Sequence, residues 1–155
     1  MSRVDEAAGD LPGALAAVER SLALHDGWAP AHELAARLAW KAGDLDRAAT
    51  HLQAALDAGG ARLSNLQKLA RAQRLLGRTD DAAATLQRGL VLAPGQPELV
   101  AALADVRRGQ GRFDEAWELL LPLARARGTD GDVGALLAAL ANDDPGGAAA
   151  RGVRR

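Results

Sequence analysis

The chain has no cysteine, no tyrosine and only one phenylalanine among its 155 residues. Without cysteine it forms no disulfide, and it has no thiolate to bind zinc or to act as a nucleophile. β-Branched residues are scarce, which argues against a sheet protein. No apolar run is long enough to span a membrane, and residues 1–10 are polar and acidic, unlike a signal peptide. The lack of a signal peptide and of a membrane-spanning run predicts a cytoplasmic protein, or a soluble piece of a larger protein, with no membrane insertion, while the lack of cysteine leaves the compartment open.

The balance of positive and negative charge bears on whether the chain binds nucleic acid. The chain carries 19 basic and 20 acidic residues, for a formal net charge of −1. Nucleic-acid binders usually carry a basic excess, so we expect no nucleic-acid partner. Alanine and leucine dominate a hydrophobic fraction of 48%, and both residues favour helices. The length is sufficient for one domain with a sizeable core.

A glycine recurs every 34 residues, at Gly9, Gly43, Gly77 and Gly111. An alanine follows each glycine after five residues, and a valine or leucine follows after nine. The alanines are Ala14, Ala48, Ala82 and Ala116, and the aliphatic residues are Val18, Leu52, Leu86 and Leu120. A fixed period in this range is the signature of a repeat array. Such arrays usually hold a partner on an extended surface and seldom carry chemistry.

Each unit of the period predicts two helices on either side of the turn glycine. The first helices are expected at 29–42, 63–76 and 97–110, and the second helices at 45–58, 79–92 and 113–126. Glycine supplies the left-handed residue that ends a helix, and acidic residues such as Asp44 and Asp80 suit the start of the next one. Small residues recur on the first helices, at Ala36, Ala70 and Ala104, where they allow the paired helices to pack closely.

These units resemble the tetratricopeptide repeat (TPR), a helix–turn–helix of 34 residues. Gly9-Asp10 and Gly43-Asp44 match the Gly-Asp turn of that family, and Pro94 matches its terminal proline. The recurring alanine with an apolar residue four positions later also matches, in all four units. In the first helix, Leu69 and Leu103 agree with the family pattern, each with a small residue after it. The resemblance implies an all-α fold of antiparallel helix–turn–helix repeats stacked in a right-handed solenoid.

The register divides the chain into a TPR-like array at 1–141 and a disordered tail at 142–155. Within the array we expect a partial repeat at 1–28, full repeats at 29–62, 63–96 and 97–130, and a capping helix at 131–141. The tail prediction rests on its glycine, alanine and arginine content around Pro145.

The partial first repeat lacks most of its first helix. Its second helix carries an apolar face formed by Leu11, Leu15, Val18 and Leu22. An uncovered apolar face of this size tends to find a partner, which predicts either a homodimer through the truncated repeat or a neighbouring repeat of a longer array. A short helix at Arg3–Ala8 that covers the face is the alternative.

The family resemblance implies that the first helix of each repeat lines a concave inner face. The positions that we expect to contact a partner there are Arg37, Trp40, Lys41, Gln67, Arg71, Arg74, Asp105 and Arg108. The guanidinium group of arginine can bind a carboxylate through two N–H groups, and Trp40 offers a surface to anchor an apolar side chain. This basic stripe predicts an acidic peptide or a free C-terminus as the ligand, and a solvated helix face with alternating charge is the alternative. Some TPR proteins bind a carboxylate through a clamp of asparagine, lysine and arginine residues. The asparagines of that clamp are absent here, so we predict no such clamp.

No group of residues predicts catalysis, a cofactor or a metal site. The three histidines are His25, His32 and His51, and the first two straddle a turn without the spacing of a shared metal site. Asp80–Asp81 and Asp114–Glu115 fall at helix starts, where the helix dipole explains them. No nucleophile-elbow or phosphate-binding glycine motif is present. We therefore expect no enzyme activity.

The function expected from the sequence is a non-enzymatic scaffold that binds an acidic protein or peptide on its concave face. One alternative is an accessory TPR segment of a larger bacterial assembly, in secretion, polysaccharide export or a transferase-associated region. Another alternative is a self-associating structural module.

Overall fold

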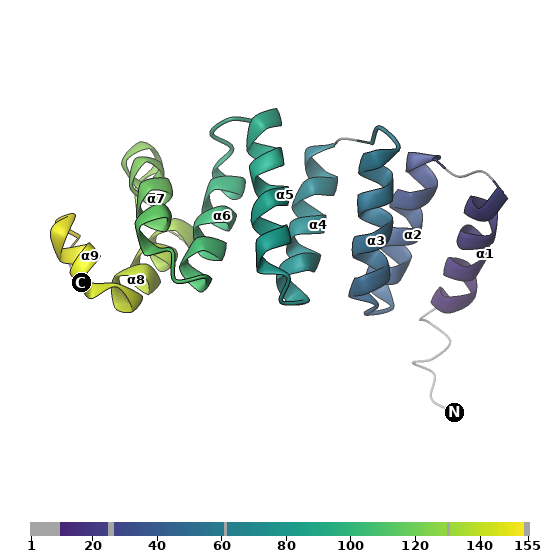
Figure 1. Cartoon of the computed structure of the whole chain (residues 1–155), viewed down its shortest axis with the longest axis horizontal. Helices are drawn as coiled ribbons and strands as arrows, with labels where there is room; N and C mark the ends of the chain where they lie inside the picture. Colours follow the sequence, from purple (N-terminus) through teal and green to yellow (C-terminus); the bar gives the residue numbers. More distant parts are fainter. Residues whose placement is uncertain (1–9, 25–26, 61, 130, 154–155) are drawn as a thin grey trace, which may run out of the picture. The chain divides into compact units, whose positions relative to one another are not determined.

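The computed structural model describes residues 10–24, 27–60, 62–129 and 131–153, and these residues form α-helices and no strand (Figure 1). The helices are α1 Leu11–Leu24, α2 Ala29–Lys41, α3 Leu45–Asp57, α4 Leu63–Leu75, α5 Thr79–Leu92, α6 Pro97–Gly109, α7 Phe113–Arg127, α8 Asp132–Asp143 and α9 Pro145–Ala150. The predicted all-α class of helix–turn–helix repeats is confirmed. None of these helices is both long and apolar enough to cross a lipid bilayer.

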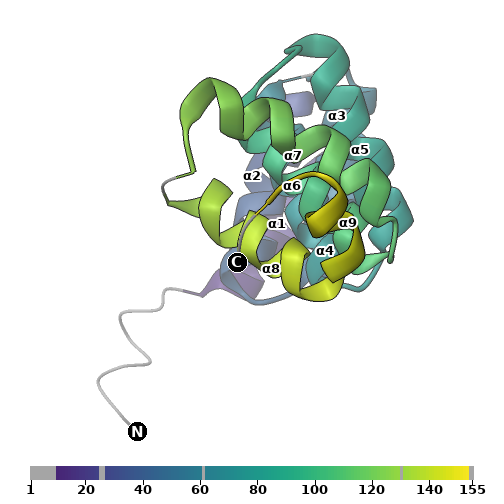
Figure 2. The same cartoon turned by 90° about the vertical axis from the view of Figure 1, so that its left-hand side faces the viewer.

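The chain divides into two compact units, one ending at Arg78 and the other beginning at Thr79. In the first unit, α2 packs against both α1 and α3, and α3 also packs against α4. In the second unit, α6 packs against α5 and α7, and α8 lies against α6, α7 and α9 (Figure 2). The division falls inside the segment predicted as the repeat 63–96, and the repeat boundaries stay predictions.

The turn between the two helices of each 34-residue repeat has the geometry that its glycine predicts. Gly43, Gly77 and Gly111 all adopt positive φ, at +79°, +73° and +72°. The residue after each glycine donates its backbone N–H to a carbonyl five residues earlier, at 2.8–2.9 Å for Arg78 to Gln73 and Arg112 to Arg107. This is the Schellman arrangement, which satisfies carbonyls that the end of a helix leaves unpaired.

Alanine at Gly111 is expected to lower the free energy of unfolding by about 1–2 kcal/mol, because a β-carbon is strained in the left-handed conformation. Gly109, two residues earlier in α6, is the matched control. A β-carbon there meets no atom within 4 Å, so Gly109→Ala is expected to stabilise the protein by about 0.5–1 kcal/mol. Urea denaturation followed by circular dichroism measures both changes, and equal shifts of the two variants would contradict the assigned turn.

Most of the small residues that recur every 34 positions are buried. Ala36, Ala70 and Ala104 on the first helices are buried, and so are Ala48, Ala82 and Ala116 on the second helices. Ala104 of α6 and Ala116 of α7 lie in one core cluster, as the prediction of close packing between these two helices requires, and for the other positions close packing stays a prediction. Ala14, the corresponding residue of α1, is exposed.

The apolar face of α1 is covered within the chain. Leu15 and Leu22 are buried in a cluster with Ala31, Ala35 and Ala39 of α2, and Val18 packs against the same cluster. Residues 3–8, the alternative cover, lie outside the described residues. The structure thus removes the reason for predicting a homodimer through this face.

The C-terminal segment differs from the predicted disordered tail over residues 142–153. Residues 142 and 143 belong to α8, and 145–150 form α9. Asp144 begins α9 by accepting hydrogen bonds from the Gly147 backbone N–H and from Trp117 Nε1, both at 2.9 Å. Ala148 is buried against Trp117 in the core of the second unit. A side-chain cap and a distant tryptophan therefore order a segment whose own composition favours disorder.

These two hydrogen bonds, from Gly147 first and Trp117 second, hold the pKa of Asp144 below its usual value. Because the folded pKa is the lower one, the contribution of Asp144 to stability is present above the unfolded value of about 3.9 and is lost as the pH falls through the folded pKa. We expect the hydrogen-exchange protection of α9 to fall on acidification, and Asp144→Asn to remove that pH dependence. Wild-type protection that stays constant between neutral pH and about pH 3 would contradict the assignment.

Candidate functional site

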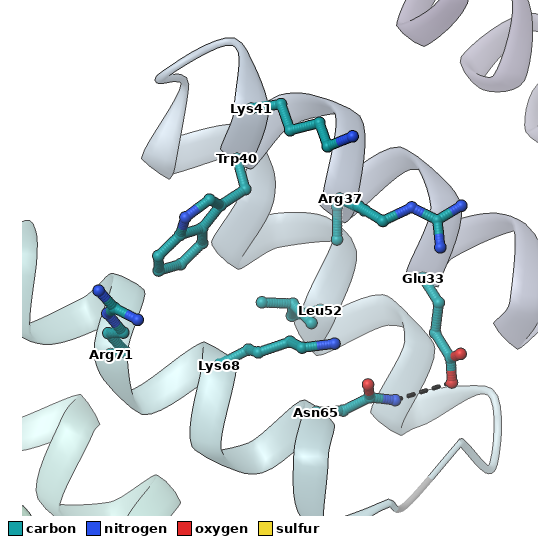
Figure 3. A pocket seen from close by; sticks show the side chains of 9 residues that line it. Glu33, Arg37, Trp40, Lys41, Leu52, Asn65, Lys68 and Arg71 are labelled. Atoms are coloured by element: carbon teal, nitrogen blue, oxygen red, sulfur yellow. Dashed lines mark hydrogen bonds between the residues drawn. The ribbon is translucent and has the colours of Figure 1, made fainter.

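A hollow of about 330 Å³ lies on the first unit, between α2 and α4, with α3 below it (Figure 3). We name it the α2–α4 hollow. It is lined by Glu33, Ala36, Arg37, Trp40 and Lys41 of α2, by Leu52 of α3, and by Asn65, Lys68 and Arg71 of α4. Its size is at the lower end of the range of ligand pockets in proteins.

The floor of the hollow is apolar. Leu52 and Ala36 are each 3% exposed and belong to one core cluster, against which Trp40 packs. The indole of Trp40 is half-buried, and it points from α2 toward α4 (Figure 3). The floor and the indole together form a surface suited to one apolar side chain of a ligand.

Arg71 lies over the ring of Trp40. Its Cζ atom lies 5.5 Å from the centroid of the indole ring, within the range of a cation–π contact (Figure 3). A cation–π contact holds the guanidinium beside the ring, and no carboxylate among the described residues binds it. The contact therefore keeps Arg71 at the hollow, and a guanidinium can bind a carboxylate through two N–H groups.

The rim of the hollow is positively charged. Arg37, Lys41, Lys68 and Arg71 are all exposed, and in the part of the chain that the structure describes no carboxylate pairs with any of them. Glu33 is the acidic residue of the lining, and its Oε1 accepts a 2.8 Å hydrogen bond from buried Asn65.

The charge of Glu33 is further offset by Arg62, whose Nη1 lies 3.8 Å from its Oε2. Asn65 also donates to the Gly60 carbonyl at 3.1 Å, which fixes its amide in place. Glu33 is thus held at one end of the hollow and leaves the four rim cations unneutralised.

Two basic residues outside the hollow, Arg78 and Arg151, are bound to carboxylates. Arg78 binds Asp46 at 2.6 Å, and Arg151 binds Asp114 at 2.7 Å. Gln110 likewise donates to Asp80 at 2.7 Å. Asp46, Asp80 and Asp114 occupy the same register position, so these acids stabilise contacts between neighbouring helix pairs.

The structure brings together four of the residues that the sequence singles out, Arg37, Trp40, Lys41 and Arg71. Gln67 is half-buried and Arg74 is exposed on α4, and neither lines the hollow. Whether any of these residues binds a partner stays a prediction.

Asp105 and Arg108 belong to the second unit and are bound to each other. Arg108 Nη2 lies 3.0 Å from Asp105 Oδ1, and its Nη1 lies 2.6 Å from Oδ2 of Asp143 at the end of α8. These bonds, the one to Asp143 foremost, raise the pKa of Arg108 above its ordinary value. A partner at Arg108 would have to displace a carboxylate of the chain itself.

The sequence interpretation missed Asn65, Lys68 and Leu52 as residues of the site. Asn65, Lys68 and Arg71 follow at intervals of three residues, which places them on one face of α4. This spacing is a signal that was available for the α4 residues. Leu52 carried no such signal, because its register position predicts only a core residue.

Two of the three histidines contribute to the packing of the first unit. His32 Nδ1 and His51 Nδ1 are 3.2 Å apart, and His51 Nε2 lies 3.3 Å from Oε1 of Glu19. The chain of contacts connects α2, α3 and α1. His25 lies outside the described residues, which themselves contain no group of three potential metal ligands.

Two family models, both described as tetratricopeptide repeat, match the chain over residues 73–140 and over residues 1–62 and 33–97. The chain belongs to the tetratricopeptide repeat family. TPR proteins are in general non-enzymatic scaffolds that bind protein or peptide partners, and the sequence-based identification is confirmed. No curated protein matches the chain.

Several solved TPR-like structures share the fold. A crystal structure of MamA has a TM-score of 0.74 at 17% identity, covering 99% of this chain and 87% of that one. The structure of YrrB, described as a TPR protein with an unusual peptide-binding site, has a TM-score of 0.67 at 18% identity, with coverage of 91% and 81%. A thermophilic TPR protein of Thermus thermophilus has a TM-score of 0.60 at 22% identity, with coverage of 85% and 73%. At these identities the likeness concerns the fold alone.

Proposed function

We propose that this TPR protein is a non-enzymatic scaffold that binds an acidic peptide segment of a partner protein in the α2–α4 hollow. The observation that carries the proposal is the combination, in one place, of an apolar floor and four cations that bind no carboxylate among the described residues. Complementary charge speeds encounter and selects among partners, while a buried apolar anchor supplies affinity. The hollow offers both on helices of one compact unit.

The arrangement also favours this hollow over the predicted stripe in the second unit. Arg108 there is bound by Asp105 and Asp143 of the same chain. Arg37, Lys41 and Lys68, by contrast, keep their donors available for a ligand. A peptide therefore gains ion pairs at the α2–α4 hollow without breaking any that the protein already has.

A peptide-display selection on the immobilised protein tests the proposal. The enriched sequences are expected to be acidic, to bind the wild type, and to lose binding to Arg71→Glu. Arg88→Glu is the matched control, because Arg88 is exposed on α5 of the second unit and does not line the hollow. Enriched peptides that bind Arg71→Glu as well as wild type, or a selection with no enrichment, would contradict the proposal.

A further inference from the structure

The cations of the α2–α4 hollow are distributed on two sides of its apolar floor. Arg37 and Lys41 come from α2, and Lys68 and Arg71 come from α4, with Leu52 between the two helices (Figure 3). A single carboxylate, such as a chain terminus, contacts one such cation or two neighbouring ones. Several carboxylates spread along a segment can pair with cations on both sides.

The apolar part of the lining requires one anchor of matching chemistry. Leu52, Ala36 and the indole of Trp40 provide an apolar patch within about 330 Å³ of space. That space suits one large aliphatic or aromatic side chain. An anchor flanked by acidic residues would place carboxylates close to the cations of both helices.

Glu33 defines the end of the hollow that an acidic ligand avoids. It carries the negative charge of the lining and is held in place by Asn65. At the other end, Arg71 is held beside Trp40 by a cation–π contact and has no carboxylate partner among the described residues. The strongest acid contact is therefore expected at Arg71, away from Glu33.

From these observations we infer that the hollow recognises an internal segment with one large apolar side chain between acidic side chains, and not a free C-terminus. This inference rests on the proposed function and specifies its ligand. Recognition is by side-chain carboxylates at Arg37, Lys68 and Arg71, with the apolar anchor on Leu52 and Trp40. The main chain of the ligand continues beyond the hollow in both directions.

Four fluorescein-labelled peptides test the inference by anisotropy titration. The first has one leucine between two pairs of glutamates and blocked ends. The second replaces the glutamates with glutamines, the third replaces the leucine with serine, and the fourth is the glutamine peptide shortened to end in leucine with a free carboxylate. The first is expected to bind at least about tenfold more tightly than each of the others, since it alone has both the anchor and the charges.

Two protein variants assign the effect to the hollow. Lys68→Glu and Arg37→Glu are each expected to weaken the glutamate peptide several-fold and to leave the glutamine peptide unchanged, whereas Arg88→Glu changes neither. Raising the salt concentration should weaken the glutamate peptide selectively, because exposed ion pairs are screened.

The outcomes separate the inference from the proposed function. Equal binding of the glutamate and glutamine peptides, or tightest binding of the peptide with the free carboxylate, would overturn the inference. If no synthetic peptide binds while display yields ligands that depend on Arg71, the inference fails and the proposed function stands. If display yields no ligand that depends on Arg71, the proposed function itself fails.

Discussion

Trp117→Ala is expected to lower the free energy of unfolding by about 3–5 kcal/mol, the range typical of removing a large buried aromatic side chain. Trp117 is 0% exposed and lies at the centre of the core cluster of the second unit. Its Nε1 also donates to Asp144, which caps α9. The variant therefore loses packing and the contact that joins α7 to the start of α9. Urea denaturation measures the loss.

Trp28→Ala is the matched control for this prediction. Trp28 is 62% exposed before the start of α2, so its removal is expected to change stability by less than about 0.5 kcal/mol. Hydrogen exchange adds a second measurement, because α9 should lose protection in Trp117→Ala and keep it in Trp28→Ala. Similar losses of stability in the two variants would contradict the assigned core.

Trp40→Ala is expected to weaken the binding of an acidic, leucine-containing peptide by about 2 kcal/mol, close to thirtyfold. The substitution removes one wall of the α2–α4 hollow and the ring that makes the cation–π contact with Arg71. Trp40→Phe keeps an aromatic surface and should recover most of the affinity. Anisotropy titration measures the affinities, and circular dichroism checks that the helices are retained.

Trp28→Ala is also the control for the binding experiment, since Trp28 is the exposed tryptophan of the same unit and does not line the hollow. It is expected to leave the affinity unchanged. A ligand that depends on Trp28 and not on Trp40 would place the binding site at the turn between α1 and α2. That result would refute the assignment of the site to the α2–α4 hollow.

The helices could be predicted from the sequence because their determinants are local. The glycine at Gly43, Gly77 and Gly111 fixes where each first helix ends, and the apolar period fixes which face is buried. α9 could not be predicted in this way. Its order depends on Trp117, which lies 27 residues before Asp144 in the chain.

For the same reason, only part of the candidate site could be predicted from the sequence. Helical spacing identifies Arg37, Trp40 and Lys41 as neighbours on one helix, and Arg71 as a residue of the next first helix. The sequence does not show that Leu52 of α3 forms a floor between them. The sequence also does not show that Asp143 binds the guanidinium of Arg108, because that contact spans 35 residues and requires α8 to pack on α6.

The central claim is that a partner segment binds in the α2–α4 hollow of the first unit. Its most direct test is an NMR titration of the ¹⁵N-labelled protein with the leucine peptide flanked by glutamates. The account predicts saturable shifts of the Ala36, Arg37, Lys68 and Arg71 amides and of the Trp40 indole N–H, with the Trp117 indole unchanged. Shifts confined to the second unit, or no saturable shifts at all, would contradict it.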